Sequence, residues 1–342
     1  MRVDDFDFEL PAERIAQRPA PRGTSRLLVL DAEGPARHRR CDELPALLRA
    51  GDLLVVNDTR VIPARLFARR PGGGRVELLL VERRSERDWD CLVRPGRGAR
   101  PGARLELDEG LAVEIVGALD DGRRRVRFST PIEPHLERLG HVPLPPYVAR
   151  PDEPADRESY QTVFARAPGA IAAPTAGLHF SRELVAALAG AGVELAAVTL
   201  HVGVGTFKPM TARLVHEHRM EAERYVVSSA AAAALARARA DGRRVIAVGT
   251  TVVRTLESAA RAGGGEIAPG AASTELFVTP GFRFQVVDLL LTNFHLPRST
   301  LLLLACAFAG RERVLAAYRE AIREGYRFYS YGDAMLAARQ RG

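Results

Sequence analysis

The sequence contains little cysteine and no long apolar run. Its three cysteines, Cys41, Cys91 and Cys306, are widely spaced and form no CxxC pair, so neither a disulfide framework nor a zinc knuckle is expected. No apolar stretch approaches the roughly 20 residues of a membrane helix, and the acidic start, MRVDDFDFELPAER, lacks the apolar region of a signal peptide. We therefore predict a cytoplasmic protein without a membrane segment.

Several ligand-binding motifs are absent as well. The Gly-Lys-Ser/Thr of a Walker loop does not occur, and GVG at residues 203–205 is too short for a GxGxxG dinucleotide turn. His216 and His218 are close in sequence, but no third ligand follows at a spacing typical of a metal site. We therefore expect no metal ion.

Lysine is almost missing, since Lys208 is the only one, and the formal net charge of +7 rests on arginine. Residues 94–104, RPGRGARPGAR, hold four arginines and no acidic residue. The pattern has two interpretations, a solvated loop or a loop that contacts phosphate groups, because guanidinium forks match phosphate geometry. A basic balance alone is only a weak indication of nucleic-acid binding.

The 342 residues suffice for two domains, and 46% hydrophobic with 27% charged residues is ordinary for a globular protein. Residues 62–153 show mostly period-two patterns, which indicate a small antiparallel barrel or sandwich, with strands at 75–83 and 88–95 and a hairpin over 111–128. On either side, strands are expected at 26–30, 52–56, 193–201, 244–249 and 284–292, and helices at 44–50, 182–191, 230–241, 250–260, 300–309 and 311–324. We expect Thr250 to cap one helix, and Ser299 or Thr300 to cap another.

This alternation of strands and helices predicts the fold class. We expect a layered α/β domain with a mostly parallel sheet, formed by residues 1–61 and 154–342. A small antiparallel β-barrel domain, residues 62–153, is expected to interrupt it as an insertion.

Two segments combine small residues with a histidine: PGAIAAPTAGLHF at 168–180 and TLHVGVGTF at 199–207. Small residues let backbone N–H groups approach a ligand, Gly177 can adopt a positive φ, and histidine transfers protons near neutral pH. The alternative is that these turns only reverse the chain and that each histidine is a satisfied polar residue.

Three motifs follow predicted strands, where ligands bind in open α/β sheets. They are HVGVGTF, VGTTVVRT and TNFHLPRST, after the strands at 193–201, 244–249 and 284–292. Asn57, Asp58 and Arg60 form a polar cluster after another strand. Arg60 is expected to hold a carboxylate or phosphate, or else to form a salt bridge within its domain.

Across its whole length the chain resembles the S-adenosylmethionine:tRNA ribosyltransferase-isomerase family of queuosine biosynthesis. The motifs that carry the resemblance occur in the same order: DFDFELP (5–11), GDLLVVNDTRVIPARL (51–66), PLPPYV (143–148), DRESYQTVF (156–164), APTAGLHF (173–180), VTLHVGVGTF (198–207), VIAVGTTVVRTLES (245–258), LLLTNFHLPRSTLL (289–302) and YRFYSYGDAM (326–335). The resemblance implies the same two-domain arrangement.

The resemblance also implies a reaction. The ribosyl part of S-adenosylmethionine is transferred to 7-aminomethyl-7-deazaguanine (preQ1) at the wobble position of tRNA and is isomerised to an epoxycyclopentanediol. Adenine and methionine leave, and the product is epoxyqueuosine-tRNA. S-adenosylmethionine is then a co-substrate, no other cofactor is required, and we expect a monomer whose partner is tRNA carrying preQ1.

The reaction requires a base near neutral pKa and groups that contact S-adenosylmethionine. The acid/base candidates are His179, His201 and His295, of which one is expected to be structural. The candidates for contact with S-adenosylmethionine are Thr175, Gly177, Gly203, Gly205, Thr250 and Arg60. Tyr329, Tyr331 and Asp333 are expected either to contact the substrate base or to pack the end of the chain, and with the resemblance the 94–104 loop is expected to contact RNA.

Two other functions stay open on the residues alone. An S-adenosylmethionine-dependent tRNA methyltransferase would release S-adenosylhomocysteine in place of adenine and methionine. A non-catalytic tRNA-binding protein would use the β domain and the 94–104 loop, with strong salt dependence and no turnover.

Overall fold

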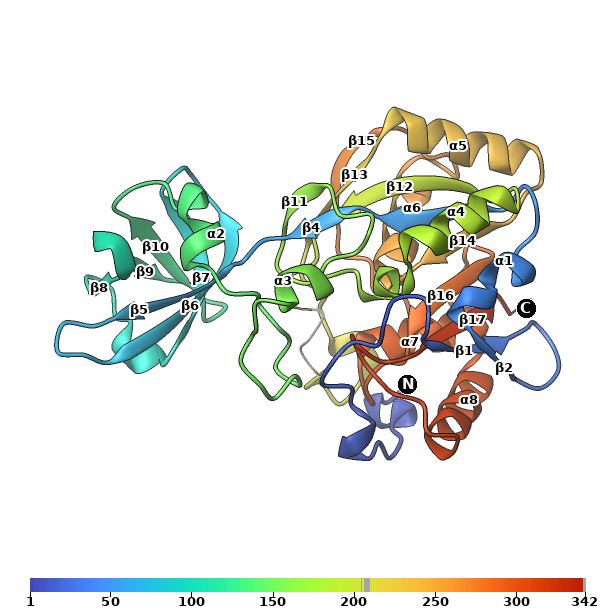
Figure 1. The fold of residues 1–342 in the computed structure, drawn as a ribbon, viewed down its shortest axis with the longest axis horizontal. Helices are drawn as coiled ribbons and strands as arrows, with labels where there is room; N and C mark the ends of the chain where they lie inside the picture. The colour runs from blue at the N-terminus through green and yellow to red at the C-terminus, as the bar shows by residue number, and fades with distance from the viewer. Residues whose placement is uncertain (204, 206–209, 341–342) are drawn as a thin grey trace.

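The computed structural model describes residues 1–203, 205 and 210–340. The chain forms an α/β domain and a smaller closed β-barrel that lies to one side of it (Figure 1). The barrel comes between two stretches of the α/β domain in the sequence. The predicted fold class, an α/β domain with an inserted antiparallel barrel, is therefore confirmed.

One mixed sheet organises the α/β domain. Its strands, in spatial order, are β15 (Gly270–Thr274), β13 (Glu223–Val227), β12 (Glu194–Leu200), β3 (Leu53–Asn57), β14 (Val245–Val248), β16 (Leu289–Asn293), β17 (Ala334–Ala338), β1 (Arg26–Leu30) and β2 (Arg37–Arg40). The central strands β12, β3, β14 and β16 are parallel, whereas β13, β15, β17 and β2 each add an antiparallel pair. The carboxyl ends of the four central strands therefore meet at one edge of the sheet.

Helices cover both faces of this sheet because successive side chains of a strand point to opposite faces. In β3, Leu53 and Val55 pack on one side and Leu54 and Val56 on the other, and all four are buried. The helices on the first side are α5 (Ser229–Ala240), α6 (Thr250–Ala262), α7 (Thr300–Ala309) and α8 (Arg311–Arg323). Those on the second side are α1 (Leu44–Leu47) and α4 (Arg182–Gly190).

Two local predictions are wrong. The strand expected at 284–292 begins only at Leu289, because the backbone N–H groups of residues 285–287 donate to the buried carboxylate of Glu257 at 2.8–3.1 Å instead of to a neighbouring strand. Thr250 is the first residue of α6 and not its cap, since the N-cap is Gly249 with a φ of 94°, a conformation that glycine adopts without steric cost. The prediction for α7 is confirmed, because the Ser299 hydroxyl accepts from the N–H of Leu302.

The barrel closes in the strand order β10-β7-β6-β5-β8-β9. Its strands are β5 (Arg65–Arg69), β6 (Arg75–Arg83), β7 (Asp88–Arg94), β8 (Arg104–Glu106), β9 (Ala112–Ala118) and β10 (Arg124–Phe128). Period-two alternation gives it a core, since Val76, Leu78 and Leu80 of β6 are fully buried. The strands predicted from the period-two pattern are confirmed, and the domain limits at 62 and 153 stay a prediction.

Two segments join the barrel to the α/β domain. The outgoing segment is β4 (Thr59–Val61), which pairs in parallel with β11 (Ala167–Ala170). The returning segment, residues 129–166, contains the short helices α2 (Leu136–Leu139) and α3 (Asp156–Ser159). At its barrel end, His141 pairs with Arg65 of β5, and its Nδ1 lies 3.0 Å from Asp152 Oδ1.

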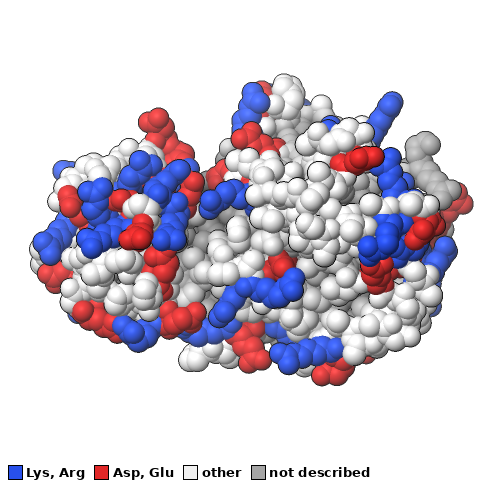
Figure 2. Space-filling model, turned by 90° about the horizontal axis from the view of Figure 1, so that it is seen from above, with Lys and Arg blue, Asp and Glu red and all other residues white. Residues whose placement is uncertain are grey.

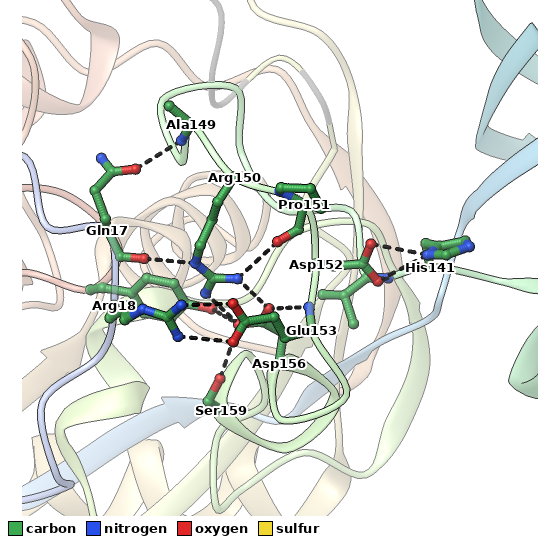
Figure 3. Close-up of polar contacts among 12 residues, drawn as sticks. Gln17, Arg18, His141, Ala149, Arg150, Pro151, Asp152, Glu153, Asp156 and Ser159 are labelled. Atoms are coloured by element: carbon green, nitrogen blue, oxygen red, sulfur yellow. Dashed lines mark hydrogen bonds and ion pairs between the residues drawn. The ribbon is translucent and has the colours of Figure 1, made fainter.

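An ion pair and a hydrogen bond fasten the returning segment to the N-terminal chain (Figure 3). The Arg150 guanidinium donates to both oxygens of the buried Asp156 carboxylate, at 2.6 and 2.7 Å, and to the backbone oxygen of Gln17. Arg18 forms the same two-pronged contact with Glu153 at 2.9 and 2.7 Å. The segment is therefore held in place by the α/β domain and is more than a tether.

Candidate active site

A cleft separates the barrel from the α/β domain. It contains two adjoining cavities, of about 500 and 430 Å³, and five residues line both: Val81, Gly169, Ile171, His201 and Arg224. Val81 comes from β6 of the barrel, whereas the other four belong to the α/β domain. His201 therefore lies where the two cavities join and where both domains approach each other.

The position of His201 follows from the end of β12. Its backbone N–H donates to the carbonyl of Arg224 at 3.1 Å, which extends the pairing of β12 with β13. Its Nδ1 lies 2.8 Å from the hydroxyl oxygen of Thr59. Burial, and next the positive charge of Arg224, lowers the pKa of His201, while Asp58 offsets part of this effect. The imidazole is therefore neutral at pH 7 and can accept a proton.

The turn after His201 carries two of the predicted ligand contacts. Gly203 and Gly205 both line the 500 Å³ cavity. The N–H of Gly203 donates to Glu223 Oε1 at 2.9 Å, and the other oxygen of Glu223 pairs with the buried guanidinium of Arg254. This ion pair fixes the start of the turn. Residues 204 and 206–209, which complete the motif, lie outside the described residues.

In the polar cluster after β3, two side chains have a structural role and one is exposed at the surface. The Asn57 amide bonds both backbone groups of Leu200, and Asp58 accepts from the Thr199 hydroxyl at 2.6 Å, so both side chains hold β12 in place. Arg60 is about half exposed, lines the 430 Å³ cavity and lies 3.8 Å from Glu137 of α2. Of this cluster, Arg60 is the member that faces the cleft.

A second group of predicted residues lies inside the α/β domain, where Gly177, His179 and Thr250 are buried and Thr175 is half-buried. Thr175, Gly177 and His179 lie on the 3-10 helix η7 (Thr175–His179), which contacts β16, and Thr250 begins α6. His179 Nδ1 lies 3.0 Å from the Ser25 hydroxyl, and burial lowers the pKa of His179 to about 4. None of the four lines the two cleft cavities as far as the described residues define them. Gly177 has a packing reason, because a Cβ there would lie 2.8 Å from the Thr162 methyl carbon.

His295 is placed apart from both groups. Its Nε2 lies 2.8 Å from the Thr292 hydroxyl, and its backbone N–H donates to the Tyr318 hydroxyl at 3.1 Å. Burial lowers the pKa of His295 to about 3. This histidine is neutral at pH 7 and packs against the α8 side of the sheet, so its surroundings match a structural hydrogen-bonding role.

Of the three residues predicted near the C-terminus, two pack the interior and one contacts the returning segment. Tyr331 is buried and donates to Asp156 at 3.2 Å, and Asp333 accepts from the backbone N–H groups of Arg26 and Arg327. Both therefore pack the end of the chain. Tyr329 packs against Tyr147, with ring centroids 4.0 Å apart and the rings tilted by 49°, which joins the returning segment to the chain that leads into β17.

Sequence reasoning missed two residues that line the cleft, Gly169 and Trp89, and one, Thr59, that contacts His201 but lines neither of the two cavities that the described residues define. Thr59 belongs to the NDTR motif, but only its neighbours Asn57, Asp58 and Arg60 are selected from the sequence, because their side chains are charged or carry an amide. Gly169 belongs to the first small-residue segment, and a Cβ there would lie 2.9 Å from His201 Cε1. Trp89, the single tryptophan, lines the 430 Å³ cavity from the barrel; no local pattern in the sequence distinguishes it from a core residue.

Arginine dominates the charge of the barrel, and Figure 2 shows basic side chains gathered on that part of the molecule with acidic ones among them. Arg84, Arg125 and Arg127 are paired with Asp88 or Asp90. The arginines of the 94–104 loop differ: Arg94, Arg97, Arg100 and Arg104 are exposed, and none forms an ion pair within the described part of the chain. The loop itself is anchored, since Ile115 donates to the carbonyl of Ala103.

Two other kinds of site are absent from the described residues. Among residues 1–203, 205 and 210–340, no three His, Cys, Asp or Glu side chains are grouped so as to hold a metal ion. In the same ranges, no helix has the length and apolar character needed to cross a membrane.

A cleft at the carboxyl ends of parallel strands, with a neutral histidine inside and a β-barrel on its far side, defines a two-domain enzyme of the α/β class. A family model described as queuosine biosynthesis protein matches residues 3–337. The chain therefore belongs to the queuosine biosynthesis protein family.

Close relatives carry one name. The S-adenosylmethionine:tRNA ribosyltransferase-isomerase of Anaeromyxobacter sp. is 56% identical over 99% of both chains, and that of Moorella thermoacetica is 54% identical over 98% of this chain and 99% of its own. A crystal structure of the S-adenosylmethionine tRNA ribosyltransferase of Thermotoga maritima is 42% identical, covers 97% of this chain and 99% of its own, and has a TM-score of 0.55.

Proposed function

We propose that this protein is an S-adenosylmethionine:tRNA ribosyltransferase-isomerase. It transfers the ribosyl moiety of S-adenosylmethionine to preQ1 at the wobble position of tRNA and isomerises it, giving epoxyqueuosine-tRNA, adenine and methionine. The observation that carries the proposal is identity above 50%, over nearly the full length, to relatives of that name. S-adenosylmethionine is consumed as a co-substrate, and no separate cofactor takes part.

The cleft supports this chemistry through His201. A proton beside the sulfonium must be removed, and a neutral imidazole is a suitable base at pH 7. The adjoining cavities give room for two reactants, one approached by the backbone of Gly203 and Gly205 and the other by Arg60. In this proposal His179, whose buried Nε2 has no hydrogen-bond partner among the described residues, is a neutral polar group of the interior and not the base.

The barrel supplies the RNA contact. The four exposed arginines of the 94–104 loop have no carboxylate partner within the described residues, so binding phosphate groups would break no existing ion pair. Phosphate contacts set the register of a nucleic acid, while the reacting base is held elsewhere. The monomeric state and the cytoplasmic location stay predictions.

Mass spectrometry of a reaction with S-adenosylmethionine and tRNA bearing preQ1 tests the proposal. We expect adenine, methionine and an epoxycyclopentanediol adduct on the base. His201→Ala should lower kcat by about 10²–10⁴-fold, the usual contribution of a general base, and His38→Ala, at an exposed pair with Glu320, should not.

The other outcomes separate the alternatives. S-adenosylhomocysteine with a methylated base would identify a methyltransferase, and tight tRNA binding without turnover would identify a binding protein. Turnover of His201→Ala within about threefold of wild type would remove His201 from the base role, since it is far below the loss expected for a general base.

A further inference from the structure

We infer that Thr59 is a positioning residue for His201, which it holds as the Nδ1–H tautomer so that the Nε2 lone pair is left for the cleft. Thr59 is fully buried, and its own N–H donates to Asn57 Oδ1 at 3.1 Å. Its side chain is therefore fixed by the scaffold and not by the ligand. The inference deepens the proposed function, and both the tautomer and the kinetic part rest on the base role proposed for His201.

Two neighbours of the Thr59 hydroxyl bear on the tautomer. The oxygen lies 2.8 Å from His201 Nδ1 and 3.5 Å from the carbonyl oxygen of Ala167, the residue opposite Thr59 in the β4–β11 pair. The contact with Ala167 is too long to direct the hydroxyl hydrogen, and the hydroxyl is able to accept from Nδ1 or to donate to it. The hydrogen is assigned to Nδ1 because the base role of His201 requires an unprotonated Nε2 at the cleft, and a neutral ring carries a single N–H hydrogen.

Gly169 fixes the ring from its other side. A Cβ at this position would lie 2.9, 3.0 and 3.3 Å from Cε1, Nδ1 and Nε2 of His201, closer than real side chains allow. The φ of Gly169, 142°, is also one that other residues rarely adopt. The Cε1 end of the imidazole therefore lies close to the bare backbone of Gly169, with the Thr59 hydroxyl at Nδ1.

The second ring nitrogen has no such partner. His201 Nε2 makes no hydrogen bond to any residue described, and the ring lines both cleft cavities. The charged groups nearest the ring are Arg224, which disfavours its protonated form, and Asp58, which favours it. The Asp58 carboxylate accepts hydrogen bonds from Thr199 and Arg166 and makes none with the ring. Thr59 is therefore the residue that orients the His201 ring.

Nitrogen-15 NMR of the substrate-free protein tests the tautomer directly, with His201→Gln used to assign the signals. We expect a protonated Nδ1 and an unprotonated Nε2 in wild type and in Thr59→Ser. Thr59→Val, which keeps the shape and loses the hydroxyl, should shift the ring towards the Nε2–H form. A protonated Nε2 in wild type, or identical spectra for wild type and Thr59→Val, would overturn the inference.

Kinetics adds a second readout. Thr59→Val should lower kcat by about tenfold or more, a loss of about 1.4 kcal/mol in transition-state stabilisation, with KM for both substrates within about twofold because no substrate contact is removed. Thr59→Ser should restore most of kcat. If the spectra are as expected but wild type releases no adenine, the proposed function fails and the positioning role stands. If Thr59→Val does not fold, the wild-type spectrum alone decides.

Discussion

Three histidines of this chain illustrate how surroundings decide the chemistry of one residue type. His201 lies in a cleft, and its Nε2 makes no hydrogen bond to a described residue, whereas His179 and His295 are buried among polar partners. All three are predicted as acid/base candidates because each lies in a motif that matches the family, at a predicted loop. Burial depends on which elements pack above each motif, and that is not a local property of the chain.

The two buried histidines predict a pH dependence of stability. The unfolded chain protonates histidine near pH 6.5, but the folded protein does so only near 4 for His179 and 3 for His295. Between these values the unfolded state binds more protons, so the free energy of unfolding is greatest above about pH 6.5 and falls as pH decreases, by up to about 1.4 kcal/mol per pH unit for each histidine.

Urea unfolding between pH 4 and 7 measures this slope. For His295→Gln, the free energy of unfolding should change less steeply with pH than for wild type. The variant lacks one of the two buried histidines, whereas its carboxylates are the same as those of wild type. Parallel curves for the two proteins would mean that His295 takes up its proton in the folded state as readily as in the unfolded state.

At the scale of elements, most strands and helices follow from local pattern. Residues 75–83 alternate with period two and form β6 over the same range, and the apolar run 300–309 forms α7. The error at 284–288 has a distant cause: the Glu257 carboxylate comes from a helix formed about 30 residues earlier and takes the N–H groups that a strand would use. No window of sequence contains both partners as neighbours.

The 94–104 loop is an element whose charge predicts a function. Replacing Arg97 and Arg100 by Gln should weaken tRNA binding and reduce the slope of log affinity against log salt by about 0.7–0.9 for each phosphate group that the variant no longer binds. Arg127→Gln with Arg138→Gln is a matched control, because those arginines are paired with Asp88 at 2.8 Å and Glu109 at 2.9 Å. Both double variants lose two positive charges, so equal reductions of affinity would show that net charge, and not the loop, determines binding.

At the scale of the whole molecule, the position of the barrel depends on how the returning segment is held. Burial raises the pKa of Asp156, but hydrogen bonds from Arg150 and from the Glu153 N–H more than offset this and leave the pKa lowered. The carboxylate also accepts from Tyr331, so one buried charge joins the N-terminal chain, the returning segment and the C-terminal turn.

We predict that Asp156→Asn lowers the free energy of unfolding by about 3 kcal/mol, because it leaves Arg150 without its partner in a largely buried place. Glu153→Gln is the control: its pair with Arg18 is exposed, with 43% and 64% of the side chains accessible, and its removal should have a much smaller effect. Denaturant unfolding monitored by circular dichroism compares the two. Equal reductions in the free energy of unfolding for both variants would show that the exposed Arg18–Glu153 pair contributes as much stability as the buried Arg150–Asp156 pair.

The place of β17 has a consequence for synthesis on the ribosome. This strand, formed by residues 334–338, lies between β16 and β1 in the sheet. The hairpin β1–β2 therefore has no neighbour to join in this sheet until residues 334–338 have been translated. Until then the nascent chain presents two open strand edges, which are templates for wrong pairing. Residues 334–338 then join the two parts of the sheet.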